Sequence, residues 1–206
     1  MPLTSKKVYF ADRVFYVPTN VYEPAEDSFL FAENLVVGNG DRVVDMGTGC
    51  GILGIVAAAR ASEIVAVDIN PYAVLSAKRN AAVSHVSHKM SFIRGNLFAS
   101  LRKTGLFDLI LFNAPYLPSE EGERSSWPER AWSGGLTGRW IIDDFIREAP
   151  KYLRPKGLIL LMQSTLSNVK ETLCGFEEKN LKTDVIARES LPFFETIILI
   201  RAEATV

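Results

Sequence analysis

The sequence of 206 residues contains little cysteine and little histidine: its only cysteines are Cys50 and Cys174, and its only histidines are His85 and His88. Two cysteines exclude a disulfide framework. The histidines have no cysteine or acid ligands near them in sequence, so they do not form the pattern of a zinc site. We therefore expect no bound metal, and a reducing compartment such as the cytoplasm.

Long apolar runs and an excess of one charge are also missing. No run approaches the roughly 18 residues that cross a bilayer, and the segment from Met1 to Lys7 lacks the apolar stretch of a secretion signal. Lysine and arginine total 23 against 24 aspartates and glutamates, a net charge of −1, which indicates no broad basic surface for nucleic acid. The length suits one α/β domain, and we expect residues 1–206 to form it.

What the sequence does contain is a glycine-rich turn, with Gly47, Gly49 and Gly51, between a short apolar strand and a helix of small residues. Glycines let the backbone turn tightly and approach a ligand closely. The next predicted strand, from Ile64 to Asp68, ends in an acid. A carboxylate in that place can accept hydrogen bonds from ribose hydroxyls, so the two segments together predict a site for a nucleoside cofactor.

Two cofactors fit this pattern. The segment from Gly49 to Gly54, with Asp68 at the expected distance downstream, matches the dinucleotide fingerprint of nicotinamide dehydrogenases. Asp45 argues against a dinucleotide, because an acid beside the turn would repel a pyrophosphate. S-adenosylmethionine has no phosphate, and its ammonium and sulfonium groups would be favourable neighbours for Asp45. Methyl transfer is therefore favoured over hydride transfer.

A second motif, Asn113-Ala114-Pro115-Tyr116, follows the apolar run from Phe107 to Phe112. This run predicts a buried strand of a parallel sheet, and open α/β sheets place their ligands at the carboxyl ends of their strands. The asparagine offers a carbonyl acceptor, the proline restricts the backbone, and the tyrosine offers a flat ring. Asparagine and proline are also ordinary turn residues. Together with the glycine turn, the motif favours a site for an amide or an aromatic amine.

Three segments carry a resemblance to a known family. They are Val21 to Leu30, the glycine turn together with Asp68-Ile69-Asn70-Pro71, and Asn113 to Tyr116 followed by Ala131 to Arg139. In their order and spacing the chain resembles the class I S-adenosylmethionine-dependent methyltransferases. Within them it is similar to the HemK-like amino methyltransferases, in the archaeal and eukaryotic branch that modifies release factors.

Patterning and resemblance together predict a doubly wound, Rossmann-like sheet of seven strands, mostly parallel and with an antiparallel edge strand. A small N-terminal extension over residues 1–35, a hairpin and a helix, should contribute to the cofactor site, with the hairpin as a lid. Helices are expected over 25–35, 71–82, 141–153 and 166–178. Further strands are expected over 91–94, 158–162, 185–188 and 194–201, and the segment from Tyr116 to Trp132 should be irregular.

The resemblance also implies roles for individual residues. S-adenosylmethionine would be bound by Ser28, Asp45, Gly47, Gly49, Gly51, Asp68, Ile69, Asn96, Leu97 and Asn113. The catalytic residues would be Asn113, Ala114, Pro115 and Tyr116. Two positions depart from the family: Ala114 stands where a proline is usual, although the main-chain carbonyl is retained, and Asn96 stands where an acid is usual. An asparagine carbonyl can accept the same hydrogen bond from the adenine amino group.

The implied substrate is the glutamine of the Gly-Gly-Gln loop of a translation release factor. Methylation of the exocyclic amine of adenine in RNA or DNA, or of a protein lysine, remains open, as does a catalytically silent cofactor-binding subunit. The resemblance further implies a small zinc-binding activator that adds a strand beside the third strand of the sheet. Met90, Phe92 and Ile93 would form that edge, because an open strand edge invites pairing.

Overall fold

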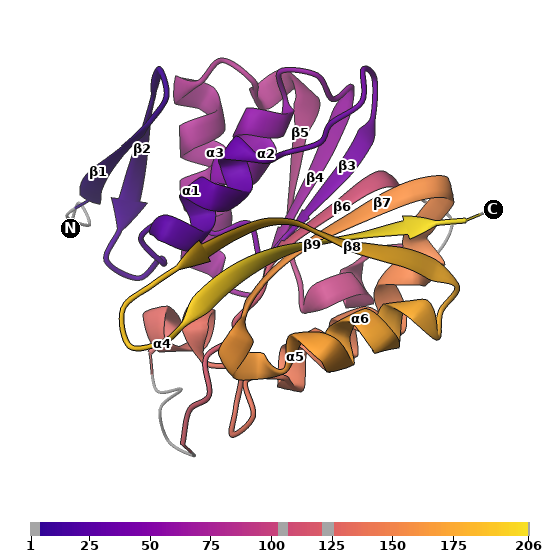
Figure 1. Cartoon of the computed structure of the whole chain (residues 1–206). Helices are drawn as coiled ribbons and strands as arrows, with labels where there is room; N and C mark the ends of the chain where they lie inside the picture. Colours follow the sequence, from indigo (N-terminus) through magenta and orange to yellow (C-terminus); the bar gives the residue numbers. More distant parts are fainter. Residues whose placement is uncertain (1–4, 103–106, 121–125, 206) are drawn as a thin grey trace.

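Seven strands form one sheet in the order β5-β4-β3-β6-β7-β9-β8 (Figure 1). The structure is a computed structural model that describes residues 5–102, 107–120 and 126–205. The strands β3 to β7 are parallel, and β9 runs antiparallel to its neighbours β7 and β8. The predicted seven-stranded sheet with its antiparallel edge is confirmed. The strands are β3 (Arg42–Met46), β4 (Glu63–Asp68), β5 (Met90–Arg94), β6 (Phe107–Asn113), β7 (Leu153–Ser164), β8 (Leu181–Ser190) and β9 (Thr196–Ala204).

Helices cover both faces of the sheet. In Figure 1, α1, α2 and α3 lie on one side of it, and α5 and α6 lie on the other. The helices are α1 (Glu26–Glu33), α2 (Ile52–Ala57), α3 (Pro71–Val83), α4 (Trp127–Trp132), α5 (Trp140–Glu148) and α6 (Val169–Glu177). Short 3-10 helices cover Ser87–Lys89, Leu97–Ser100, Ala149–Tyr152 and Thr165–Ser167. The predicted start of α3 at Pro71 is confirmed: the Asn70 side chain caps the helix by accepting from the Tyr72 amide.

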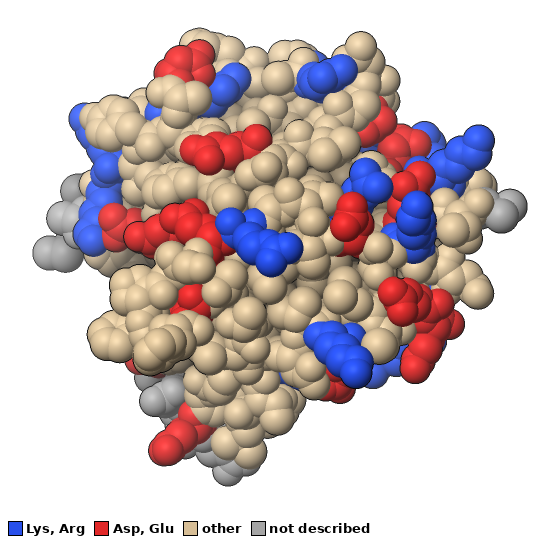
Figure 2. All heavy atoms as spheres, viewed as in Figure 1, with Lys and Arg blue, Asp and Glu red and all other residues tan. Residues whose placement is uncertain are grey.

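Charges of both signs are spread over the surface. On the face drawn in Figure 2, acidic and basic side chains are interspersed, and much of the area between them carries neither. None of the helices in the described ranges has the length and apolar character needed to cross a bilayer.

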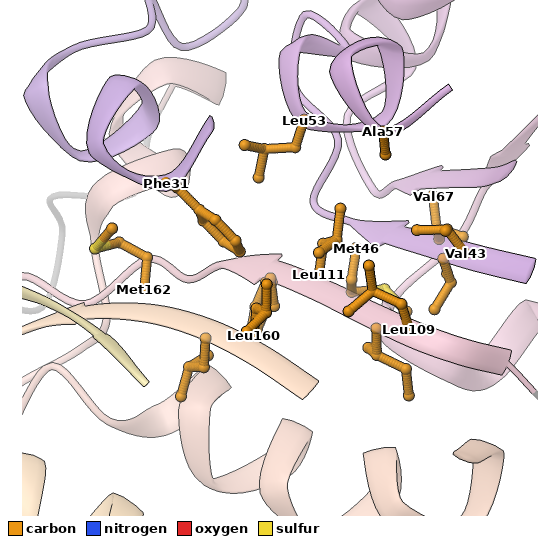
Figure 3. Close-up of a cluster of buried hydrophobic side chains, with 14 of the residues drawn as sticks. Phe31, Val43, Met46, Leu53, Ala57, Val67, Leu109, Leu111, Leu160 and Met162 are labelled. Carbon is orange, nitrogen blue, oxygen red and sulfur yellow. The ribbon is translucent and has the colours of Figure 1, made fainter. Parts of the chain in front are cut away.

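The core lies between the central strands and the helices. Figure 3 shows Phe31 of α1 and Leu53 of α2 directed toward Leu111 of β6 and Leu160 of β7. The strand β6 is apolar from Leu109 to Phe112 and buried on both faces, as expected for a central parallel strand. This burial fixes the position of β6 and therefore the place where Asn113 leaves the sheet.

The N-terminal hairpin consists of β1 (Ser5–Phe10) and β2 (Arg13–Pro18), as predicted. It packs on α3, where the Asn80 side chain accepts from the Tyr16 amide at 2.9 Å and donates to the Tyr16 carbonyl at 3.1 Å. No residue of β1 or β2 lines the cavity described below, so the hairpin does not serve as a lid. The segment that follows it, from Val21 to Ser28, lines the cavity instead.

Two other predictions were wrong in detail. The segment from Tyr116 to Trp132, expected to be irregular, contains α4, whose first turn is closed by reciprocal hydrogen bonds between Ser126 and Glu129. Residues 121–125 of that segment lie outside the described residues. The last strand begins at Thr196, because Phe194, predicted as its first residue, lies in the turn between β8 and β9.

Candidate active site

The carboxyl ends of β3, β4 and β6 meet at one edge of the sheet, beside a cavity of about 720 Å³. This edge is where open α/β sheets bind their ligands. Of the predicted site residues, Asp45 and Gly51 do not line the cavity. The others do: Ser28, Gly47, Gly49, Asp68, Ile69, Asn96, Leu97, Asn113, Ala114, Pro115 and Tyr116.

Asn113, the last residue of β6, has a fixed amide orientation. Its Nδ2 donates to Asp27 Oδ2 at 3.1 Å and to Ser28 Oγ at 3.3 Å. A carboxylate can only accept, so the amide nitrogen must face Asp27. The Asn113 Oδ1 atom is consequently turned away, and it is buried without a hydrogen-bond partner in the described part of the chain. A buried acceptor without a partner calls for an explanation, and a donor on a bound ligand would supply one.

Asp27 connects three parts of the site. Besides the Asn113 amide, its Oδ2 accepts from the Tyr116 hydroxyl at 3.3 Å, and its Oδ1 accepts from the Tyr22 hydroxyl at 3.1 Å. The Ser28 amide also donates to Oδ1, at 2.5 Å. Sequence reasoning named Ser28 and missed its neighbour Asp27. The available signal was an acid in the first turn of α1, inside the segment that resembles the family.

The hydroxyls of Tyr22 and Tyr116 act as donors to this carboxylate. Burial, followed by the negative charge of Asp27, raises the pKa of both phenols above its ordinary value. Each hydroxyl therefore keeps its proton at neutral pH and cannot serve as a base. The role of each hydroxyl is to hold its own ring in place. Tyr116 is buried.

The glycine turn has the left-handed backbone that its residues predict: φ is 66° at Gly47 and 57° at Gly49. The turn is tied to β4, because Asp68 Oδ2 accepts from the Gly49 amide at 2.9 Å and Asp68 Oδ1 accepts from the Asn70 amide at 2.8 Å. Burial raises the pKa of Asp68. Each carboxylate oxygen has a second lone pair, so both can still accept from a ligand hydroxyl.

Asp45 lies behind the turn. Its side chain is buried, and its Oδ2 accepts from the Thr48 hydroxyl at 2.6 Å and from the Gly54 amide at 3.0 Å. Burial is the largest influence on the Asp45 carboxyl and raises its pKa to about 6. Asp45 does not line the cavity, so its bonds to Thr48 and Gly54 brace the turn, and its Oδ1 has no partner among the described residues.

Gly51 is needed for packing. Its φ is 89°, and a Cβ there would lie 3.1 Å from the α-carbon of Ala77, so a side chain would push α2 away from α3. This glycine shapes the turn without reaching the cavity, which corrects its predicted place among the lining residues.

Another wall of the cavity comes from the end of β4 and from the loops that follow β4 and β5. Ile69 and Leu97 line it with apolar side chains, and Asn96 lines it beside them. Leu97 has a φ of 45°, a conformation that a bulky residue adopts only where its surroundings hold it.

A further wall was not predicted. The residues Trp127, Arg130 and Trp132 of α4 also line the cavity. The segment after α4 is tied to the asparagine motif by a hydrogen bond from the Gly134 amide to the Leu117 carbonyl at 2.8 Å. At Gly138 a Cβ would lie 2.2 Å from the Tyr116 carbonyl oxygen, so only glycine permits this approach. The segment from Ala131 to Arg139 thus supports the motif.

Comparison with known proteins shows to which protein family this chain belongs. The family model "Methyltransferase small domain" matches residues 23–127. A "putative protein N5-glutamine methyltransferase" of Methanocaldococcus jannaschii is 44% identical over 181 residues, which are 87% of this chain and 90% of that protein. The chain belongs to this methyltransferase family. "Methyltransferase HEMK2" of Mus musculus is 33% identical, over 83% of this chain and 85% of that protein.

Solved structures share the fold of this methyltransferase. The Mtq2 of E. cuniculi, in a structure of the Mtq2-Trm112 complex, has a TM-score of 0.66 at 23% identity, covering 90% of this chain and 99% of that chain. The M. jannaschii tRNA m1G37 methyltransferase has a TM-score of 0.73 at 20% identity, covering 99% of this chain and 55% of that chain. Family membership confirms an S-adenosylmethionine-dependent methyltransferase and sets the dehydrogenase alternative aside.

The site suits this cofactor. The left-handed turn at Gly49 leaves room on its open side, since the nearest atom to an added Cβ is the Gly47 carbonyl oxygen at 3.9 Å. Asp68 supplies acceptors beside it, and Asn113 Oδ1 supplies a buried acceptor across the cavity.

Proposed function

We propose that this methyltransferase modifies the side-chain amide nitrogen of a glutamine in a translation release factor. The observation that carries the proposal is the Asn113 amide, oriented by Asp27 and Ser28 so that its buried Oδ1 faces no protein donor. The relatives support the substrate class, since one is named as a putative protein N5-glutamine methyltransferase and three as release factor glutamine methyltransferases. We infer from such a substrate that the protein acts in the cytoplasm.

The cofactor would be held along the glycine turn. Gly47 and Gly49 would let its methionine part approach the backbone, and Asp68 would accept from its ribose hydroxyls. Ile69 and Leu97 would enclose the adenine, with Asn96 accepting from the adenine amino group. When bound, S-adenosylmethionine supplies an electrophilic methyl group.

The chain's own contribution is to position the acceptor. A neutral amide is a weak nucleophile because its nitrogen lone pair is delocalised into the carbonyl. Asn113 Oδ1 and the Ala114 carbonyl would accept the two N–H hydrogens, which draws electron density toward the nitrogen. The Tyr116 ring, held by Asp27, would stack on the amide plane, and Pro115 would restrict the loop. Much of the rate gain then comes from orientation.

No base is needed before transfer in this scheme. The nitrogen becomes acidic once it carries the new methyl group, and its proton leaves to solvent. The tyrosine hydroxyls cannot take it, because burial and Asp27 keep both of them protonated.

A methylation assay with labelled cofactor tests the substrate. The acceptors are an eRF1-type release factor, the same factor with its loop changed to Gly-Gly-Glu, tRNA, DNA and a lysine-rich histone-like peptide. We expect label only in the release factor with glutamine, because the glutamate variant lacks the amide nitrogen. Label in tRNA, DNA or the lysine peptide, with none in the release factor, would contradict the proposal.

We also propose a protein partner at β5. Within the described residues β5 pairs only with β4, so its other edge is open. Phe92 and Ile93 are half-buried there, and Met90 is buried. An apolar open edge favours addition of a strand from another chain. The solved complex of Mtq2 with Trm112 suggests a small activator of that type.

A further inference from the structure

Two adjacent phenylalanines stand at the tip of the last hairpin, in the turn between β8 and β9. Phe193 is 95% exposed and Phe194 is 102% exposed, more than any other large apolar side chain in the described ranges. Single exposed apolar residues are normal on protein surfaces. Two neighbouring aromatic rings in full contact with water are unusual and indicate a binding surface.

The backbone of this turn gives a second, independent indication. Phe193 has a φ of 61° and Phe194 a φ of 64°. Asparagine and glycine are the residues that adopt the left-handed conformation most readily. Bulky aromatic residues are disfavoured in that conformation. The turn thus keeps two unfavourable residues where Asn-Gly would fit better, and such an outlier points to a function.

The tip lies at the same edge of the sheet as the active site. Asn113 pairs with Met162 of β7, and Met162 pairs with Leu199 of β9. Running back from Leu199, β9 reaches Thr196, whose amide donates to Thr165 Oγ beyond the end of β7 at 3.1 Å. The tip therefore projects past the carboxyl edge, and Figure 1 shows it at the end of the molecule where α4 and the start of α1 lie.

The residue next to the tip is close enough to affect the active site. The negative charge of Glu195 contributes to the raised pKa of both Tyr22 and Tyr116. Two further exposed apolar side chains belong to segments that the tip or the motif contacts: Leu166 follows Thr165, and Leu136 lies in the segment that supports Tyr116.

We propose that the Phe193–Phe194 tip docks the protein substrate beside the cavity while the acceptor glutamine enters it. This rests on the function proposed above. The tip fits a folded protein with an apolar patch near the acceptor loop, because aromatic rings bury large apolar areas. It does not suit nucleic acid, since its neighbour Glu195 would repel phosphates.

The test is a double variant that improves the turn while removing the rings. Phe193→Asn with Phe194→Gly places at these positive φ angles two residues that adopt them readily, so stability should be kept or raised. We expect KM for the intact release factor to rise about tenfold, the loss typical of a removed aromatic anchor. The affinity for S-adenosylhomocysteine, and kcat/KM for a short Gly-Gly-Gln peptide, should stay within twofold. The matched control is Leu75→Ser, which removes an exposed apolar side chain on α3.

Each other outcome overturns the proposal in a recognisable way. An unchanged KM for the release factor would reject the docking role and leave the proposed function intact. A rise in KM for factor and peptide alike would show damage to the cavity rather than loss of a docking surface. Self-association that the double variant abolishes, with unchanged KM, would assign the tip to a second copy of the chain. If the unaltered enzyme labels neither factor nor peptide, both proposals fall.

Discussion

At the scale of single residues, the active site depends on the carboxylate of Asp27, which acts on the proposed reaction through the side chains that it holds in place. Asp27 holds the nitrogen side of the Asn113 amide and the hydroxyl of Tyr116. With Asp27 in place, only the oxygen of Asn113 can face the substrate. Its importance comes from hydrogen-bond polarity, since a carboxylate accepts and never donates.

Asp27→Asn should lower kcat by roughly 100-fold, a loss comparable to that of one preorganised hydrogen-bonding group. The new amide could donate to Asn113, which would then present its own nitrogen to the substrate in place of its oxygen. Cofactor affinity should stay within a few-fold. Steady-state kinetics and calorimetry with S-adenosylhomocysteine measure the two effects. Glu26→Gln, an adjacent exposed acid, is the control, and equal losses in both variants would refute the orienting role.

Asp45 gives a prediction on pH. Its folded pKa of about 6 lies above the unfolded value near 3.8, so the folded state binds more protons between these values. The free energy of unfolding should therefore fall as pH rises from 4 to 6, by roughly 2 kcal/mol from this group alone. Asp45→Asn should flatten this fall, as followed by urea unfolding at several pH values. Parallel curves for the two proteins would show that Asp45 is not the titrating group.

At the scale of elements, the N-terminal hairpin is joined to the cofactor turn by one buried amide. Asn80 of α3 bonds to both backbone groups of Tyr16 and donates to the Cys50 carbonyl in the glycine turn at 2.9 Å. The hairpin therefore determines where the following segment, with Tyr22 and Asp27, meets the site. A change at Asn80 of α3 should therefore disturb both the glycine turn and the segment that follows the hairpin.

Asn80→Ala should destabilise the fold by roughly 2–4 kcal/mol, because three hydrogen bonds are lost and buried backbone groups keep no partner. It should also weaken S-adenosylhomocysteine binding several-fold, since the turn loses its support. Chemical denaturation and calorimetry test both. Asn39→Ala, at an exposed asparagine that accepts from Arg60, should change neither quantity. Loss of stability with unaltered cofactor affinity would show that the hairpin and the turn are independent.

The open edge of β5 gives the second prediction at this scale. Co-expression with a Trm112-type activator should raise solubility and cofactor affinity, because the partner would cover Phe92 and Ile93. Ile93→Lys should cancel this gain, since a charge on the edge opposes pairing. Leu75→Lys, at an exposed position of α3, should leave the gain unchanged. An isolated chain that is fully soluble and active, and gains nothing from the activator, would show that the edge needs no partner.

At the scale of the whole molecule, the charge distribution bears on substrate choice. The net charge is −1, and both signs are interspersed on the face in Figure 2. A polyanion therefore meets no long-range attraction. The proposed partner edge at β5 and the proposed docking tip between β8 and β9 lie at opposite ends of the sheet order, so an activator and a substrate could bind together.

This charge balance predicts that tRNA does not compete with the release factor for the enzyme. A tenfold molar excess of tRNA over the release factor should leave the rate of release-factor methylation unchanged within about 20% at moderate salt, because there is little counterion release to drive binding. Initial rates with and without tRNA measure this. Strong inhibition that disappears at high salt would reveal a nucleic-acid surface and return RNA to consideration as substrate.

Much of this protein was predictable from contiguous residues. The glycine turn, the acid that ends β4 and the motif from Asn113 to Tyr116 each stand at the end of an apolar strand. Parallel strands bring their carboxyl ends to one edge, so local patterns sufficed to predict that most of these residues share a cavity. The seven strands and the edge position of β5 followed from the same patterns together with the resemblance.

Other features were decided only by tertiary packing. Asp27 and Asn113 are 86 positions apart, and no local pattern tells which carboxylate will meet which amide. Asp45 was expected at the ligand, yet the close packing of the turn on α2 placed it behind. The hairpin, which was expected to be a lid, packs on α3 through hydrogen bonds with Asn80. Phenylalanine is a residue type that favours strands, yet Phe194 is exposed because it precedes the first residue of β9. The start of β9 is set by its pairing with β7 and β8.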